Sequence, residues 1–345
     1  VSASRIEEAL IKQPEAKAVL ITSPNYYGVC SDIEKISEIV HAHGKILIVD
    51  EAHGAHLAFM DKIAPFRGDI KNQHSKAQKL AAEASGADIA ILSTHKTLAS
   101  FTQTAILLVC SDRVDVDTIA NNLQILQSSS PSYILMASLD MNARIIEENG
   151  DALFKEWQAD LDYAYEELRK IQGLELLEME LLDRTKLVFG LSEIGISGYE
   201  LDALLRERGI FCELSDSRFV MAMSGLGSKR KDYELLISAL NEIAEEARES
   251  SRNNARCEED EIVLMDELYR HGEISDVPSE TERLVARECD GKISAQALIP
   301  YPPGIPIIVP GERIDSEKIR VLEKLHKDGV SVIGLDENGK ILCGR

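Results

Sequence analysis

Short apolar runs that each end in polar residues constrain the fold of this chain more than any other feature. Residues 17–22 (KAVLIT), 45–50 (KILIVD) and 87–92 (ADIAIL) are rich in aliphatic and β-branched side chains, which favour strands. Amphipathic helices are predicted at residues 4–14 and 33–44, where apolar side chains recur at helical spacing. Strands that alternate with helices predict right-handed crossovers and a mostly parallel sheet.

The polar residues after these runs mark the expected ligand-binding edge of the sheet. Clusters occupy residues 22–28, 50–56 and 93–96, each at the end of an apolar run. Ligands of open α/β sheets bind beyond the carboxyl ends of the strands. We therefore expect these three clusters to line one crevice.

The remaining chain predicts a smaller domain and a C-terminal module. A helical stretch over residues 131–172 is expected to lead from a large domain at residues 1–150 into a small α/β domain at residues 151–255. Residues 256–345 form the expected C-terminal module, which contains a final strand pair around Gly339. Other predicted elements are strands at 104–110, 185–191 and 218–224, and helices near 71–85 and at 198–209 and 232–249.

Charge and cysteine content narrow the range of partners. The formal net charge of -21 arises from 59 acidic against 38 basic residues, and such a surface repels nucleic-acid phosphates. No apolar run reaches the roughly 18–20 residues that span a bilayer. The six cysteines are scattered and include no CxxC pair, which fits reduced thiols in the cytoplasm. The sequence thus predicts neither a nucleic-acid partner nor a membrane partner.

Asp50 and Lys96 each stand at the end of an apolar run, so a parallel sheet would place a carboxylate and an amine at one edge. A lysine among apolar neighbours favours its neutral, nucleophilic form, which condenses with an aldehyde to a Schiff base. Ser93 and His95 could donate hydrogen bonds to an anionic group. A carboxylate opposite would keep a ring nitrogen protonated. Together these demands describe pyridoxal phosphate chemistry.

Each of these motifs also has a simpler interpretation. A lone lysine after a strand is most often a solvated loop residue, and the tetrapeptide DEAH (residues 50–53) also occurs in helicases. The sequence contains no GxxxxGK[ST] loop, so a helicase would lack its phosphate cradle. The histidine pairs at 41/43 and 53/56 have the spacing of metal ligands. Without a further acidic or cysteine cluster, they are better interpreted as surface or helix-end histidines, with no metal site.

Five longer stretches, taken together, are far more specific than any single motif. In chain order they are TSPNYYGVCSD (22–32), ILIVDEAHGAHLAF (46–59), GADIAILSTHKTLASFTQTAILL (86–108), LQSSSPSYILMASLD (126–140) and PYPPGIPIIVPGE (300–312). Through them the chain resembles the Orn/Lys/Arg decarboxylases, which share the aspartate-aminotransferase-like type I fold of pyridoxal-phosphate enzymes. The resemblance implies an α/β protein with a three-layer, mostly parallel sheet in its large domain, a smaller α/β domain and a C-terminal module.

The resemblance also implies roles for individual residues around pyridoxal phosphate. Lys96 would bind the cofactor as a Schiff base, and Asp50 would pair with its pyridine nitrogen. The serine and the histidine that precede the lysine would contact the phosphate, and Ala52 and His53 would lie near the ring. Lys96 or His53 would return a proton to Cα of the substrate. The expected cofactor-binding residues are therefore Asp50, Ala52, His53, Ser93, His95 and Lys96.

The reaction implied by the resemblance is decarboxylation of a basic amino acid. Arginine, lysine or ornithine would give the corresponding polyamine-pathway amine and CO2, and the sequence does not distinguish among the three. Residues 128–130 would approach the active site of a neighbouring subunit, so a homodimer or a higher homo-oligomer is expected. Glu312 could receive the cationic end of the substrate, although a purely structural role in its Pro/Gly turn fits equally well.

Relative to the family pattern, the chain is expected to lack an N-terminal part. That part carries the phosphate-binding loop and the group that stacks on the pyridine ring. Two other functions stay compatible with the residues: a truncated or catalytically silent homologue that acts as a dimerisation or regulatory partner, and another type I enzyme such as an aminotransferase. The PPGIP…PGE element disfavours the second, because ordinary aminotransferases do not carry it.

Overall fold

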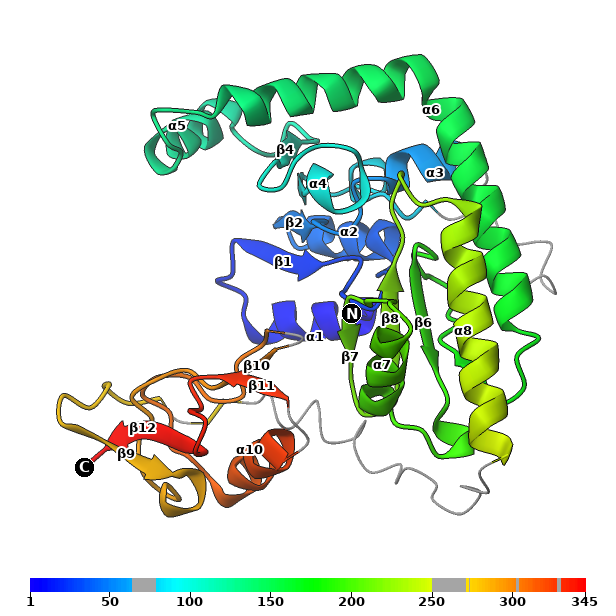
Figure 1. The fold of residues 1–345 in the computed structure, drawn as a ribbon. Coiled ribbons are helices and arrows are strands. Elements are labelled where there is room, and N and C mark those ends of the chain that lie inside the picture. The colour runs from blue at the N-terminus through cyan, green and yellow to red at the C-terminus, as the bar shows by residue number, and fades with distance from the viewer. Residues whose placement is uncertain (64–78, 250–270, 273, 302–303, 328–329) are drawn as a thin grey trace. The chain divides into compact units, whose positions relative to one another are not determined.

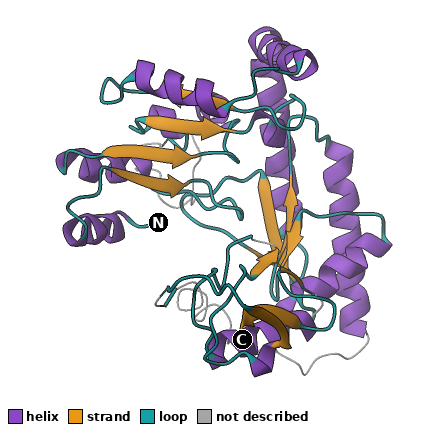
Figure 2. Ribbon diagram, turned by 90° about the vertical axis from the view of Figure 1, so that its left-hand side faces the viewer, coloured by secondary structure: helices purple, strands orange, loops and turns teal. Residues whose placement is uncertain are grey.

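The first sheet of the computed structural model has the strand order β1-β2-β3-β4. Its strands are β1 (Ala18–Thr22), β2 (Ile46–Asp50), β3 (Ile89–Leu92) and β4 (Ile106–Val109). The first three run parallel, and β4 runs antiparallel to β3 (Figures 1 and 2). The structure thus contains the mostly parallel sheet predicted from the sequence, with an antiparallel strand at one edge.

Two short helices pack on this sheet, and both begin at a side-chain cap. In α1 (Ala3–Lys12) the hydroxyl of Ser2 accepts a hydrogen bond from the Arg5 amide, and in α2 (Ile33–Ala42) the Asp32 carboxylate accepts one from the Lys35 amide. Their apolar faces and the sheet share one buried cluster, which includes Ile6, Leu10, Ile33, Ile36, Val40, Leu47 and Val49. Burial of these faces holds the strand ends in place.

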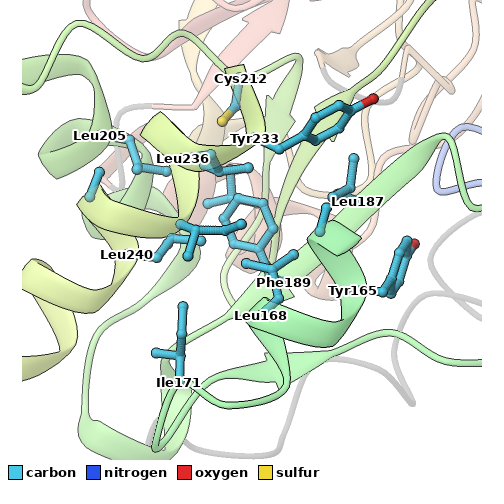
Figure 3. Packing of buried hydrophobic residues seen from close by; sticks show 14 of the residues in the cluster. Tyr165, Leu168, Ile171, Leu187, Phe189, Leu205, Cys212, Tyr233, Leu236 and Leu240 are labelled. Atoms are coloured by element: carbon cyan, nitrogen blue, oxygen red, sulfur yellow. The ribbon is translucent and has the colours of Figure 1, made fainter. Parts of the chain in front are cut away.

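A second, antiparallel sheet has the order β5-β6-β8-β7. Its strands are β5 (Glu175–Leu176), β6 (Lys186–Gly190), β7 (Leu214–Ser215) and β8 (Val220–Met223). The helices α6 (Tyr133–Leu168), α7 (Gly198–Glu207) and α8 (Arg230–Glu249) bury apolar side chains against it. Figure 3 shows Leu168, Phe189, Leu236 and Leu240 pointing toward one another in this core.

The helix α6 has two contrasting halves. Its C-terminal half contributes Phe154, Trp157 and Leu161 to the core of the second sheet. Its N-terminal half and α5 (Val116–Leu126) lie away from that core, along the top of Figure 1. Tyr133 and Ile134 at the start of α6 are exposed, so this half presents apolar side chains to the surroundings.

The structure describes residues 1–63, 79–249, 271–272, 274–301, 304–327 and 330–345, which cluster into two compact units, Val1–Ala255 and Arg256–Arg345. The division expected at residue 150 stays a prediction, and that position lies inside α6. The helix expected near 71–85 falls largely outside the described residues. The short elements of the first unit are α3 (Leu57–Ile63), η1 (Ala82–Ala84), α4 (Thr94–Thr97) and η2 (Ser192–Ile194).

The C-terminal unit has its own buried core and two antiparallel strand pairs. Its elements are β9 (Thr281–Val285), η3 (Ala286–Glu288), β10 (Ile299–Tyr301), α10 (Ser316–Lys327), β11 (Ser331–Ile333) and β12 (Lys340–Gly344). The predicted strand pair around Gly339 is wrong. The strands on either side of Gly339 pair with earlier strands, β11 with β10 and β12 with β9.

Candidate active site

Asp50 and Lys96 reach the same edge of the first sheet from neighbouring strands. Asp50 is the last residue of β2 and lies opposite Thr22 of β1 and Ile91 of β3 in the strand register. The Glu51 amide donates to the Ile91 carbonyl at 2.9 Å, which continues the pairing beyond the strand end. Lys96 follows β3 in α4. The carboxyl edge of the sheet thus holds both groups, as the polar clusters predicted.

His53 is the side chain in contact with the Lys96 amine. Its Nε2 lies 3.0 Å from Lys96 Nζ, and only 6% of His53 is exposed. A protonated lysine has no lone pair, so Nζ donates to Nε2 and the ring proton resides on Nδ1. Nδ1 is buried without a hydrogen-bond partner among the described residues. His53 therefore presents one engaged nitrogen and one unsatisfied donor in the site.

Burial makes both members of this pair less basic than free side chains. It lowers the pKa of Lys96, with an added contribution from the Lys186 ammonium, and the Asp50 carboxylate opposes the change. Burial also lowers the pKa of His53 to about 4, and the positive charges of Lys96 and Lys186 contribute. At neutral pH the imidazole is uncharged, and the amine loses its proton more readily than an exposed lysine does.

The remaining predicted residues are held by local hydrogen bonds at the same edge. The Ala52 amide donates to Asp50 Oδ1 at 3.0 Å and orients the carboxylate. Ser93 is the N-cap residue of α4, and its hydroxyl makes no capping hydrogen bond. Nδ1 of His95 lies 2.9 Å from the Thr104 carbonyl oxygen and donates to it, so Nε2 is the ring nitrogen that a ligand would meet.

A buried hydroxyl cluster fixes the loop that follows Lys96. The Thr94 and Thr104 hydroxyls lie 2.9 Å apart, and the Ser100 hydroxyl lies within 2.8 Å of both. These bonds connect the start of α4 to the end of the loop, two residues before β4, because Thr94 and Thr104 lie on opposite sides of the loop. They explain why the sequence between the two strands is rich in serine and threonine.

Comparison with known proteins identifies the family. The sequence model of the Orn/Lys/Arg decarboxylase major domain matches residues 1–189, and that of the Orn/Lys/Arg decarboxylase C-terminal domain matches residues 263–330. The chain belongs to the Orn/Lys/Arg decarboxylase family. The resemblance drawn from the five sequence stretches is thereby confirmed.

Its relatives in this family carry different substrate names. A Bacillus subtilis protein named arginine decarboxylase is 32% identical over 343 residues, which cover 96% of this chain and 66% of that protein. Lysine decarboxylase LdcA of Pseudomonas aeruginosa is 23% identical, over 91% of this chain and 53% of that protein. The chain thus spans between about half and two thirds of the length of these two curated relatives.

Solved structures confirm the predicted fold class. Escherichia coli constitutive lysine decarboxylase superposes with a TM-score of 0.70 at 16% identity, over 99% of this chain and 60% of that one. Alanine–glyoxylate aminotransferase from Nostoc sp. superposes with a TM-score of 0.51 at 19% identity, over 70% of this chain and 64% of that one. This decarboxylase-family chain therefore shares the architecture of aminotransferase-like enzymes.

The side chains at this edge fit pyridoxal phosphate, the cofactor that the family implies. An amine of lowered pKa suits an aldehyde, and a carboxylate at a strand end suits a protonated pyridine nitrogen. The Ser93 hydroxyl and the second ring nitrogen of His95 suit an anionic group. The unsatisfied Nδ1 of His53 is a further donor for a ligand at this edge.

The sequence pattern missed a tyrosine and a glutamate beside the site. The Tyr26 ring stands edge-on to the His53 ring, with centroids 4.8 Å apart, and its hydroxyl donates to Glu213 Oε1 at 2.7 Å. The Glu213 carboxylate attracts the Lys96 ammonium. Tyr26 lies in the polar cluster after β1, so its place at this edge could have been inferred. Glu213 directly precedes β7, far along the chain, and no local sequence pattern predicts its place near Lys96.

The histidines at 53 and 56 are buried, so the surface alternative fails for this pair, whereas the helix-end alternative holds for His56, which directly precedes α3. His56 is fully buried, and its Nε2 lies 2.9 Å from Asp183 Oδ1. A carboxylate from a distant segment makes this burial tolerable. Across the described ranges, no cluster of three or more His, Cys, Asp or Glu side chains could hold a metal ion, and no helix is long and apolar enough to cross a membrane.

Two further sequence-predicted elements have local contacts of their own. Residues 128–130 connect α5 and α6 and are exposed, and the Ser130 amide donates to the Ser128 hydroxyl at 3.1 Å. Glu312 belongs to the C-terminal unit, where it accepts hydrogen bonds from His271 Nδ1, the Gly272 and Val309 amides and Lys318 Nζ. These four donors fit the structural alternative for Glu312, and its role toward a substrate stays a prediction.

Proposed function

We propose that this chain forms the catalytic core of a pyridoxal-phosphate-dependent decarboxylase of a basic amino acid. The observation that carries the proposal is the contact between Lys96 Nζ and His53 Nε2 at the strand edge that also holds Asp50. When bound, the cofactor would accept the electrons of the Cα–carboxylate bond as CO2 leaves. The residues of this chain would bind and orient it and move protons.

Each residue then has a defined task. Lys96 Nζ would hold the aldehyde carbon and be displaced by the substrate amine. Asp50, oriented by the Ala52 amide, would keep the pyridine nitrogen protonated. Ser93 and His95 would bind the phosphate. The 3.0 Å contact lets a proton pass between Nζ and His53 Nε2, so either group could protonate Cα of the product.

The substrate is proposed to be a basic amino acid because two carboxylates, those of Asp50 and Glu213, act on the Lys96 amine. Glu213 attracts the Lys96 ammonium and is held by the Tyr26 hydroxyl. Such a carboxylate suits the distal guanidinium or ammonium group of arginine, lysine or ornithine. The relatives named arginine decarboxylase support arginine first, and the more distant lysine decarboxylases support lysine second.

We also propose that the enzyme is a homodimer that pairs through α5 and the start of α6. The exposed fractions are 79% for Ile125, 83% for Leu126 and 81% for Tyr133, and these residues flank the serines at 128–130. Large apolar side chains that are this exposed and close together along the chain are characteristic of an interface. Pairing there would cover it and bring the serines toward a second subunit. A monomeric mass by light scattering at micromolar concentration would refute this arrangement.

The function is tested by adding pyridoxal phosphate to the purified protein, fixing the complex with borohydride and mapping the labelled peptide. The label is expected on Lys96 and should disappear in Lys96→Ala, while the exposed-lysine control Lys12→Ala keeps it. Release of CO2 and amine should follow with one of the three basic amino acids. We also propose a cytoplasmic location for the enzyme, because the cysteines of the described residues are free thiols, which suit a reducing compartment.

Other outcomes would select the alternative functions. A keto acid product without CO2 would indicate an aminotransferase. Absence of any label on Lys96 would leave the silent homologue as the better explanation.

A further inference from the structure

A second lysine lies buried directly behind the His53–Lys96 pair. Lys186, the first residue of β6, is 0% exposed. Its Nζ donates to Asp183 Oδ2 at 3.0 Å and to the Thr185 hydroxyl at 3.2 Å, and it lies 3.5 Å from the backbone carbonyl oxygen of His53. The last contact connects β6 to the residue whose ring touches the Lys96 amine.

The carboxylate partner of Lys186 is itself fully engaged. Asp183 Oδ1 accepts from the Thr185 hydroxyl at 2.7 Å and lies 2.9 Å from His56 Nε2. Burial alone would raise the pKa of Asp183, but the interactions with His56, Lys186 and Thr185 outweigh it and lower that pKa, so Asp183 stays ionised. The buried quartet of His56, Asp183, Thr185 and Lys186 therefore sets the Lys186 ammonium against the Asp183 carboxylate.

This quartet connects three segments that lie far apart in the sequence. The turn after β2 supplies His53 and His56, and the segment before β6 supplies Asp183. The turn after β1 joins them because the Asp183 amide donates to the Gly28 carbonyl oxygen at 2.7 Å. A Cβ on Gly28 would lie 2.8 Å from the Asp183 carbonyl oxygen and 3.0 Å from Lys186 Cβ, so the approach is close.

A buried ion pair by itself contributes little net stability to a fold. Well-packed apolar side chains in its place are often equally stable or more stable, because desolvation offsets the attraction between the charges. Titratable groups that perturb one another near a reactive side chain are instead characteristic of functional sites. The position of this pair behind a nucleophilic lysine therefore calls for a functional explanation.

We propose that Lys186 is a positioning residue: it fixes the His53 segment through the His53 carbonyl and places a positive charge near the His53–Lys96 pair. This charge repels a proton on either group, so that the Lys96 amine is reactive and the imidazole is neutral. The proposal deepens the proposed function, on which its catalytic meaning rests, and assigns Lys186 no contact with substrate or cofactor.

Other charges also act on the pair, and the balance among them sets its protonation. Asp50 and Glu213 attract a proton to Lys96, and Asp183 attracts one to His53. Lys186 acts against them on both groups, and its effect on His53 exceeds that of Asp183. The titratable and charged groups that face the pair are thus Asp50, His56, Asp183, Lys186 and Glu213.

The test measures the reactivity of the Lys96 amine without cofactor or substrate. The whole chain is treated with trace acetic anhydride at about pH 8, and the acetylation of each lysine is quantified by mass spectrometry. In Lys186→Met the labelling rate of Lys96 should fall about threefold, because the amine retains its proton more strongly. In Lys186→Arg, which keeps the positive charge, the rate should stay near that of the original protein.

The matched control is Lys318→Met, which removes the other buried lysine of the described residues from the C-terminal unit and should leave Lys96 labelling unchanged. A merely structural role for Lys186 predicts the opposite sign, because a loosened site exposes Lys96 and raises its labelling. Unchanged or faster labelling in Lys186→Met would overturn the proposal. If that variant does not fold, the double variant Asp183→Asn/Lys186→Met, which removes both charges, is measured against Asp183→Asn with the same expected fall.

The outcome is independent of the proposed reaction. Slower acetylation in Lys186→Met would support the positioning role even if the chain proved to have no decarboxylase activity. Conversely, an active decarboxylase whose Lys96 reacts equally fast in Lys186→Met would refute the positioning role alone.

Discussion

Two buried ion pairs of this chain have the same chemistry and different surroundings. Lys186 pairs with Asp183 in the first unit, and Lys318 pairs with Glu312 in the C-terminal unit. Both lysines are at most 5% exposed, and both carboxylates accept further hydrogen bonds. What differs is where the positive charge acts. Lys186 acts on His53 and Lys96, whereas the contacts of Lys318 and Glu312 stay within the turn before α10 and the segment near residue 271.

The Lys186–Asp183 pair thus acts on the candidate site, whereas the Lys318–Glu312 pair stabilises the local fold of the C-terminal unit. Glu312 accepts from two backbone amides, of Gly272 and Val309, so its carboxylate closes turns of the chain. Asp183 accepts from the side chains of His56, Thr185 and Lys186 and from the Thr185 amide. The lysine–carboxylate pair of the C-terminal unit thus connects segments of backbone. The corresponding pair of the first unit orients side chains near His53 and Lys96.

Among substitutions in the two ion pairs, Asp183→Asn is expected to cause the largest loss of unfolding free energy. The variant leaves the Lys186 ammonium buried without its counter-charge, which costs about 4 kcal/mol of unfolding free energy. Urea unfolding followed by the fluorescence of Trp157, the single tryptophan, reports on this unit. The control is Asp162→Asn, whose partly exposed pair with Arg184 should contribute less than about 1 kcal/mol. Equal effects of the two variants would contradict a special role for the buried pair.

A smaller loss is expected from Glu312→Gln, because the new side chain can still accept a hydrogen bond from a backbone amide. The variant removes the charge that balances Lys318, and the expected cost is about 3 kcal/mol, confined to the C-terminal unit. Hydrogen exchange of peptides from α10 should become faster. The control Glu317→Gln changes an exposed carboxylate of the same helix and should have little effect. A loss of substrate affinity with unchanged exchange would instead favour the substrate-binding role of Glu312.

The contrast between the units also shows how far the sequence alone could lead. Asp50, His53 and Lys96 were predictable because they follow strands whose period and direction are encoded locally. Lys186 and Asp183 were not, because a lysine at the start of an apolar run has the same pattern whether it is exposed or buried. Only the packing of a segment more than 120 residues from His53 decides which it is.

The same reason accounts for the error in the C-terminal unit and for the burial of His56, which no local pattern predicted. A glycine between two short apolar runs predicts a hairpin, yet β12 pairs with β9, whose residues precede Gly339 by more than 50 positions. The local pattern allowed a surface or a helix-end position for His56, and the burial of this ring depends on Asp183, which supplies its hydrogen bond. Long-range contacts of this kind are invisible to local periodicity.

The smallest effect, when counted per pH unit, distinguishes the two units by their response to acid. The pKa of His53 is lowered from 6.5 to about 4, so the unfolded chain binds a proton more tightly than the folded one between these values. The stability of the first unit should therefore fall as pH falls through this range, by at most about 1.4 kcal/mol per pH unit. Glu312, whose pKa is lowered from 4.5 to about 2, contributes stability above 4.5 that is lost only as pH falls toward 2.

Two measurements compare these ranges. The stability of the first unit, measured by urea unfolding with Trp157 fluorescence, should thus decrease at a higher pH than the hydrogen-exchange protection of α10. His53→Gln should flatten the first dependence, and His43→Gln, which changes an exposed ring, should leave it intact. If both units lost stability over the same pH range, the charge behind the active site would not differ in kind from the charge that holds the C-terminal turns.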